Sequence, residues 1–362
     1  MAVQSGIYHQ TYESDMQLRP TTAQRVRLIL AIAFVLLLPF VVSQNEVRIV
    51  NKVMIAAIGA IGLNILVGYT GQISLGQGAF LGVGAYACGL LMVYFQVPWG
   101  LALIAAAFIT AFVGALFGLP SLRLKGLYLA VATLAAQQIV EWIIIRWDPI
   151  DGTIDGRATD ALKIPSAFLF GNTAWRLNDN ENAFYYFVFV VLVVVVLGAV
   201  NLFRTHYGRA FIAIRDQDIA AEVMGVNLFY YKVLAFAISS FLVGLAGGLT
   251  TIHSTAISFE RFTIEVSIAY LAMIIVGGLG SISGAIYGAA FIEILPEILR
   301  SIGQTLVQNR IVSDQVFVTV LPFVQQGTFG VLIILMLIVE PEGIRKLWSN
   351  IKDYFRLWPF SY

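Results

Sequence analysis

Few residues of this chain have the types and spacing that catalysis or metal binding requires. Two acids of the apolar runs, Glu141 and Glu293, could act on an ion or proton. The sequence has no His-Glu-x-x-His, a single cysteine, and no Gly-Lys dipeptide that could supply the lysine of a phosphate-binding loop. The chain is therefore predicted not to be an enzyme, to bind no metal, and to have no cofactor of its own.

A glycine-rich segment, Gly68–Gly78, brings amides and hydroxyls to the edge of an apolar run. Irregular backbone at membrane depth is tolerated only where protein or a water-filled cavity satisfies its hydrogen bonds. We expect this segment to line a translocation path, although a surface turn between two spans would have a similar sequence. The predicted path residues are Asn64, Tyr69, Gln72, Ser74 and Gln77.

The composition places these residues in a membrane. Apolar residues make up 59% of the chain and charged residues 12%, against about 25% charged in soluble proteins. We predict an all-α integral membrane protein with about ten transmembrane helices. The apolar runs lie near residues 28–42, 53–67, 79–95, 99–119, 127–147, 183–203, 233–252, 265–279, 284–299 and 327–340.

The basic residues predict the orientation. With ten spans both termini lie on one side, and most of the 22 basic residues fall in segments on that side, which the positive-inside rule makes cytoplasmic. We expect a multi-pass protein of the bacterial cell (inner) membrane with both termini in the cytoplasm. The predicted parts are an N-terminal segment 1–27, a permease domain 28–340 with an outer loop 148–182 and a cytoplasmic loop 204–230, and a C-terminal tail 341–362.

The sequence of the loop 204–230 predicts that the loop contains a short helix. Asp218 could cap the amides of Ala220 or Ala221, the run through Met224 lacks glycine and proline, and Gly225 suits the left-handed position after a helix. The alanine pair leaves room for the surface of a partner. An ordinary loop helix lying on the bilayer is the alternative.

Glycines recur four residues apart in the apolar runs, a spacing that lets helices approach closely where lipid supplies no hydrophobic drive. The similarity of Gly78–Gly82 to Gly284–Gly288 also suggests two related halves. The predicted helix-packing residues are Gly244, Gly248, Gly280, Gly284 and Gly288.

Several stretches, taken in order, resemble the permease subunits of the branched-chain amino-acid importers of the ATP-binding-cassette (ABC) class. The resemblance covers about residues 50–340. It is carried by Gly62–Gly76, Leu119–Ala130, Ala221–Val226, Lys232–Phe236, Ser239–Gly248, Met273–Ser281 and Leu295-Pro296-Glu297.

The resemblance implies a heteromeric importer with a second, related permease, two cytoplasmic ATP-binding subunits that hold ATP and magnesium, and an extracytoplasmic solute-binding protein. It also implies that the cytoplasmic helix is a coupling helix that docks on an ATPase. Ala220, Ala221 and Gly225 match the Glu-Ala-Ala-x-x-x-Gly core of such helices, but Ile219 stands where the glutamate would be. The predicted coupling residues are Arg215, Asp218, Ala220, Ala221, Glu222 and Gly225.

Two alternatives for the function remain open at this point. Sister systems of similar sequence carry urea, short amides or aromatic acids in place of branched-chain amino acids. A secondary transporter that needs no ATPase would use Glu141, Glu293 and the segment Gly68–Gly78 as its ion site. Membrane lipid is an expected partner in every case, whereas nucleic acid is not, because the net charge is only +1.

Overall fold

The computed structural model describes residues 35–122, 124, 126–146, 162–163, 180–254, 256–309, 313–339 and 343–357. The predicted N-terminal segment 1–27, part of the predicted span 28–42 and most of the predicted loop 148–182 lie outside these residues. The chain divides into two units, Met1–Val47 and Arg48–Tyr362. In the first, residues 35–41 are helical and the amide and hydroxyl of Ser43 both donate to Glu46 Oε2 at 2.8 Å.

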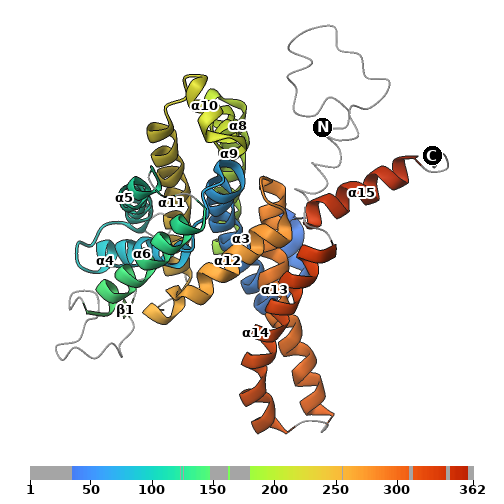
Figure 1. Cartoon of the computed structure of the whole chain (residues 1–362). Helices are drawn as coiled ribbons and strands as arrows, with labels where there is room; N and C mark the ends of the chain where they lie inside the picture. Colours follow the sequence, from blue (N-terminus) through green and yellow to red (C-terminus); the bar gives the residue numbers. More distant parts are fainter. Residues whose placement is uncertain are drawn as a thin grey trace. The chain divides into compact units, whose positions relative to one another are not determined.

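Helices dominate the described residues (Figure 1). They are α3 (Gln44–Asn64), α4 (Gln77–Val93), α5 (Trp99–Gly118), α6 (Leu127–Arg146), α8 (Glu181–Arg204), α9 (His206–Asp216), α10 (Asp218–Val223), α11 (Leu228–His253), α12 (Ile264–Gly277), α13 (Ile282–Gln308), α14 (Asp314–Val339) and α15 (Ile344–Leu357). A π-helical turn η1 (Ile65–Tyr69) and two 3₁₀ turns, η2 (Leu119–Leu122) and η3 (Phe259–Phe262), join them. Two short antiparallel strands pair, β1 (Leu162–Lys163) with β2 (Ala256–Ile257).

Seven helices among the described residues are long and apolar enough to cross a membrane: α3 with η1, α5, α6, α8, α11, α13 and α14. Helices α4 and α12 have only 17 and 14 residues. At about 1.5 Å per residue, both fall short of the ~30 Å of hydrocarbon in a bilayer. The predicted count of ten spans is not confirmed, and the apolar runs at 79–95 and 265–279 correspond to these shorter helices.

The chain leaves α3 through an irregular segment. The π-helical turn spans Ile65–Tyr69, and Gly71 then has a φ of +68°, a conformation that favours glycine. Further on, the amide of Leu75 donates to Oγ1 of Thr133 in α6 at 2.9 Å. Side chains thus satisfy backbone groups that no helix pairs. The irregular backbone expected for Gly68–Gly78 is present as far as the start of α4.

Helix α4 begins among buried residues, next to the start of α12, whose first residues are half-buried or exposed. The amide of Gly78 donates to Ser267 Oγ at 2.7 Å, and the amide of Ala79 donates to Gln137 Oε1. Gln137 in turn donates through Nε2 to the Phe262 carbonyl at 2.6 Å. The first amides of a helix have no partner within it, so these side chains replace water at the start of α4. The side-chain amide of Gln137 in α6 thereby satisfies backbone groups at the start of α4 and just before α12.

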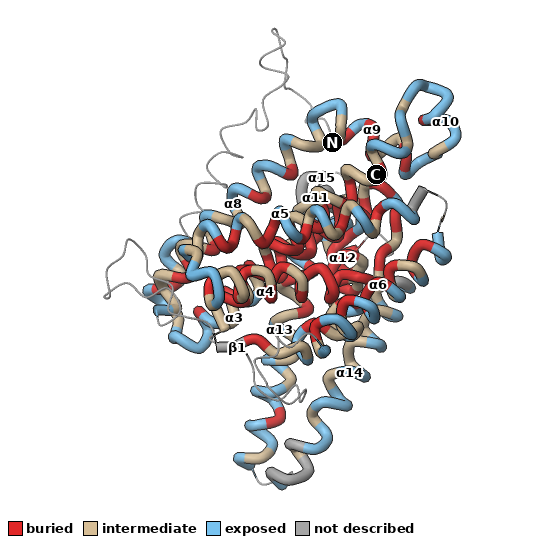
Figure 2. Tube along the Cα trace, turned by 90° about the vertical axis from the view of Figure 1, so that its left-hand side faces the viewer, coloured by how far each residue is buried: buried red, intermediate tan, exposed pale blue. Residues whose placement is uncertain are grey.

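Close helix contacts surround this junction, and buried residues concentrate along α3, α4 and α11, whereas α14 is mostly exposed (Figure 2). A Cβ added at Gly244 or Gly248 would overlap side chains of α5, and one at Gly284 or Gly288 would overlap the backbone of α12. The small residues thus lie where helices touch.

Candidate functional site

Helix α10 is short because its sequence begins and ends it within two turns. It starts at Asp218, so Gln217 and not Asp218 is the N-cap residue. It ends before Gly225, whose φ is +88° and whose amide donates to the Glu222 carbonyl at 2.9 Å. With six residues the helix is about 9 Å long. A helix this short needs tertiary contacts to be stable.

Within α10 only Ala221 is buried, and the other residues are exposed or half-buried (Figure 2). Ala221 is only 4% exposed, whereas Ile219 is 69%, Val223 82% and Met224 83% exposed. Of the alanine pair expected to face a partner, Ala221 therefore packs inward. Ala220 and Glu222 are also exposed. The three larger apolar side chains, Ile219, Val223 and Met224, are together called the α10 tip.

Arg215, near the end of α9, joins this region to two irregular turns of the membrane helices. Its Nη1 donates to the Gly68 carbonyl at 3.1 Å, in the π-helical turn after α3. Its side chain also lies against Gly71, and a Cβ at Gly280 would be 3.1 Å from Nη1. Gly71 and Gly280 both have positive φ, +68° and +70°. A single guanidinium thus bonds to the turn after α3 and lies close to the turn between α12 and α13.

Two ion pairs flank Arg215 and α10. Asp216 Oδ1 accepts from Nε and Nη2 of Arg215, each at 3.0 Å. Asp218, the first residue of α10, lies 3.7 Å from Nζ of Lys232 in α11. The Lys232 side chain is 7% exposed and that of Asp218 22%, so water screens this pair little. The pair fixes the start of α10 on the membrane helix that follows it.

A cavity of about 300 Å³ lies between these groups. It is bounded by the α9–α10 turn, the segment after η1, and the first turns of α6 and α11. Its lining includes Gln72, Leu129, Arg215 and Lys232. Of the five predicted path residues, Gln72 alone borders this cavity.

Asn64 is the most extensively bonded of the predicted path residues. It is 1% exposed, donates through Nδ2 to the Ser281 carbonyl at 2.7 Å, and accepts from the Gly280 amide at 2.9 Å. Both bonds hold the turn between α12 and α13 against the end of α3. The same turn meets Arg215, so Asn64 and Arg215 bind one element from two sides.

Three more of the predicted path residues also form intramolecular contacts. Gln77 donates through Nε2 to the Gly59 carbonyl at 3.0 Å. Ser74 is 1% exposed and accepts from the amide two residues on at 3.3 Å. The Tyr69 ring stacks on Phe203, with centroids 3.6 Å apart. These side chains hold the irregular segment in place.

Gln72, the fifth, differs from the others. It is 5% exposed, and its Nε2 donates to Thr70 Oγ1 at 3.2 Å. Its Oε1 is buried without a hydrogen-bond partner. Buried polar atoms nearly always have a partner, so this oxygen requires an explanation.

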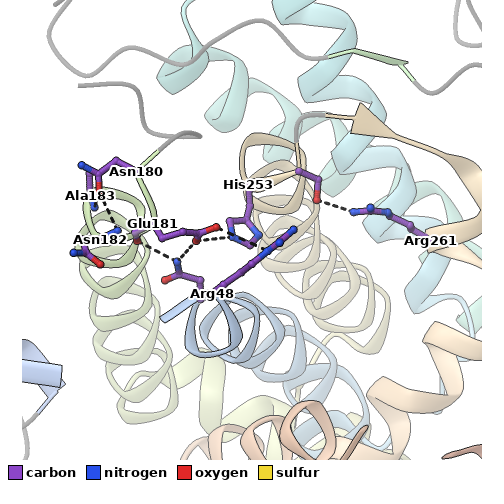
Figure 3. A network of polar contacts seen from close by, with 9 residues as sticks. Arg48, Asn180, Glu181, Asn182, Ala183, His253 and Arg261 are labelled. Atoms are coloured by element: carbon purple, nitrogen blue, oxygen red, sulfur yellow. Dashed lines mark hydrogen bonds and ion pairs between the residues drawn. The ribbon is translucent and has the colours of Figure 1, made fainter. Parts of the chain in front are cut away.

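The opposite ends of α3, α8 and α11 meet in a second polar cluster, centred on Glu181 and called the Glu181 cluster (Figure 3). Asn180 caps α8, because its Oδ1 accepts from two amides of the first turn. Glu181 Oε2 accepts from Asn51 Nδ2 at 2.8 Å and lies 3.0 Å from His253 Nε2. Arg48 Nε lies 3.9 Å from Glu181 Oε1. One carboxylate therefore joins three helices.

Sequence analysis did not single out Gln137, Ser267 or the Glu181 cluster. A signal existed for Gln137, because an amide in the middle of the apolar run 127–147 must find a partner inside the protein. No such signal existed for Glu181 and His253. They lie 72 residues apart, and each has an ordinary position at the end of an apolar run.

The described residues are mostly helical and contain seven helices apolar enough to cross a membrane. Beside the short exposed helix α10, Arg215 of α9 bonds to the irregular turn after α3. This is the architecture of a multi-pass membrane protein. Residues 45–339 match the family model described as branched-chain amino acid transport system / permease component. The chain belongs to this family.

Relatives with assigned names agree with the family match. The high-affinity branched-chain amino acid transport system permease proteins LivM of Salmonella typhimurium and Escherichia coli are each 31% identical over 343 residues, 90% of this chain and 75% of theirs. The probable branched-chain amino acid transport permease protein LivH of Methanocaldococcus jannaschii is 28% identical over 75% of this chain and 87% of its own length. No solved structure matches the chain significantly.

Proposed function

We propose that this chain forms the translocation path of an ABC importer for branched-chain, hydrophobic amino acids and couples it to ATPase subunits. Membership of the permease family and the 31% identity to the LivM proteins support the transport function. The observation that carries the coupling role is the bond from Arg215, beside the exposed helix α10, to the irregular turn after α3.

The orientation follows from the basic residues. We place α10 and both termini in the cytoplasm, where the positive-inside rule puts the segments rich in arginine and lysine. The Glu181 cluster then faces the extracytoplasmic side. An N-terminal tag accessible only from outside intact cells would contradict this orientation.

The partners follow from the class of importer. We propose two cytoplasmic subunits that bind ATP and magnesium, an extracytoplasmic solute-binding protein, and a second permease. This chain is similar to proteins named LivM and also to one named LivH, so the two permeases are themselves related. Related subunits can pair about a pseudo-twofold axis, and each would present a helix like α10 to one ATPase.

The α10 tip supplies a docking surface. Ile219, Val223 and Met224 form an apolar knob that a cleft in an ATPase subunit would bury. Closure of the ATPase pair would then move α9 and α10 together. Arg215 would carry this movement to the Gly68 carbonyl, to which it bonds, and to the turn at Gly280, which lies close to it.

The predicted path residues take a supporting role in this mechanism. Asn64, Tyr69, Ser74 and Gln77 bond the irregular segment to its neighbours, and we propose that they keep the wall of the path in register. Gln72 differs because it reaches the cavity beside α10. A movement of Arg215 would reach this wall through Gly68.

A charge at the α10 tip tests the docking. We expect Val223→Asp to lower ATP-driven leucine uptake about tenfold or more, and to reduce copurification of the ATPase, because a carboxylate would be buried in an apolar cleft. Val223→Ile is the matched control and should transport normally. Uptake by Val223→Asp equal to that of the control, at equal expression, would show that the tip does not dock.

The solute is tested by competition. In cells with and without this chain, unlabelled leucine, isoleucine and valine should displace labelled leucine, whereas urea, short amides and aromatic acids should not. Displacement by urea or by an aromatic acid at similar concentrations would instead assign the chain to a sister system.

A further inference from the structure

The cavity beside α10 has the dimensions of a small-molecule site. Its volume of about 300 Å³ lies at the lower end of the range for ligand pockets. One wall of the cavity is the α9–α10 turn. The other walls are the segment after η1 and the first turns of α6 and α11. A molecule bound there would touch the elements that Arg215 joins.

The charged groups at the cavity suit a ligand with one charge of each sign. The described lining contains two cations, Arg215 and Lys232, and two anions, Asp216 and Asp218. These four residues form two ion pairs, so the described lining residues together carry no net charge. A zwitterion can add its carboxylate beside the cations and its ammonium beside the anions at once.

The remaining lining supplies an apolar wall and one unsatisfied acceptor. Leu129 is 2% exposed and Ile214 5%, and both border the cavity. Gln72, also in the lining, has the buried Oε1 that lacks a partner. An ammonium group is the kind of donor that would satisfy this oxygen.

We propose that this cavity binds a free aliphatic α-amino acid, the product delivered by transport, and that its binding slows further uptake. The ligand carboxylate lies toward Arg215 and Lys232, its ammonium toward Asp218 and Gln72 Oε1, and its side chain on Leu129 and Ile214. An occupied cavity resists displacement of the α9–α10 turn relative to the segment after η1. The inference rests on the proposed function, which supplies the solute and places α10 on the side where it accumulates.

Binding is measured on the complete complex of permeases and ATPases, purified without solute-binding protein, by titration calorimetry with L-leucine. We expect saturable binding. We expect none with 4-methylpentanoate, which lacks the ammonium, or with 3-methylbutylamine, which lacks the carboxylate. Leu129→Phe, which fills the cavity, and Gln72→Met, which removes the acceptor, should each raise the Kd about tenfold or more. Leu116→Phe, on the exposed side of α5, is the matched control and should bind as wild type.

Feedback is measured in proteoliposomes that enclose ATP and a rising concentration of leucine. The initial rate of uptake should fall about fivefold or more in wild type, within the usual range of coupling between two sites. The Leu129→Phe protein should lose this inhibition and the Leu116→Phe protein should keep it.

Three results would overturn the proposal: no leucine binding by the complete complex, equal binding of 4-methylpentanoate, or undiminished binding by both cavity variants. Binding by the isolated permease but not by the complex would also overturn it, because an ATPase side chain would then fill the cavity. Each of these results is compatible with normal ATP-driven uptake by the complex. Failure of the proposed function would instead appear as no ATP-driven uptake, with or without internal leucine.

Discussion

The region around α10 and the Glu181 cluster contain similar polar residues, but these residues contact different kinds of structure. Around α10, Arg215 bonds to a backbone carbonyl in an irregular turn, and Lys232 and Asp218 pair beside a cavity. In the Glu181 cluster, one carboxylate contacts side chains of α3 and α11 directly, and none of these residues borders the cavity. The first region joins irregular segments, whereas the second links the ends of regular helices.

We infer from this difference that the region around α10 serves coupling, whereas the Glu181 cluster serves stability. We infer that the bond to Gly68 transmits displacement, because the π-helical turn departs from the regular α-helical hydrogen bonding of α3. A carboxylate shared by three helix ends mainly opposes their separation. Changes at the α10 end should therefore alter the number of solute molecules moved per ATP, and changes at the Glu181 cluster should alter thermal stability.

Lys232 offers the largest expected effect. Lys232→Met removes the ammonium group that pairs with Asp218 at the start of α10. Breaking a buried pair costs at most about 3–5 kcal/mol, and less here because Asp218 is 22% exposed. We expect near-complete loss of ATP-driven leucine uptake in proteoliposomes.

The double variant Lys232→Met with Asp218→Asn is the control, because it removes both charges together. It should recover a substantial part of the uptake. If the double variant were as inactive as the single one, the ammonium itself and not the pairing would be required.

A substitution at Glu181 should lower thermal stability and leave the coupling ratio unchanged. Glu181→Gln loses the charge-assisted bonds to Asn51 and His253, each worth about 1.5–3 kcal/mol. We expect the melting temperature of the purified complex to fall by a few degrees while the ratio of transported leucine to hydrolysed ATP stays constant. Glu260→Gln, an exposed acid near the same end, should change neither. A lower ratio at unchanged melting temperature would place coupling in the Glu181 cluster as well.

The Tyr69–Phe203 stack predicts the smallest effect. Tyr69→Leu removes an aromatic pair worth about 0.5–1.5 kcal/mol between the π-helical turn and the end of α8. Uptake should fall about two- to tenfold, without loss of the protein from the membrane. Tyr86→Leu, which removes the edge contact with Phe262, should affect the melting temperature instead.

The sequence predicted the elements that depend on local composition. The apolar runs predict most of the long helices, and the run ending at Gly225 predicts α10 as a short helix. It did not predict that Ala221 packs inward, because six helical residues do not reveal which side meets the rest of the protein. Nor could it show that α4 and α12 begin side by side. That arrangement depends on Gln137 and Ser267, which lie 130 residues apart.

The central claim, that Arg215 transmits the movement of α10, is tested most directly by the coupling ratio. Leucine transported per ATP hydrolysed is measured in proteoliposomes for Arg215→Gln and for Arg209→Gln, the same change at an exposed arginine of the same helix. Loss of the charge-assisted bond to Gly68, about 1.5–3 kcal/mol, predicts a ratio lowered roughly tenfold or more in Arg215→Gln. It also predicts a normal ratio in Arg209→Gln. Equal ratios in the two variants would contradict the account.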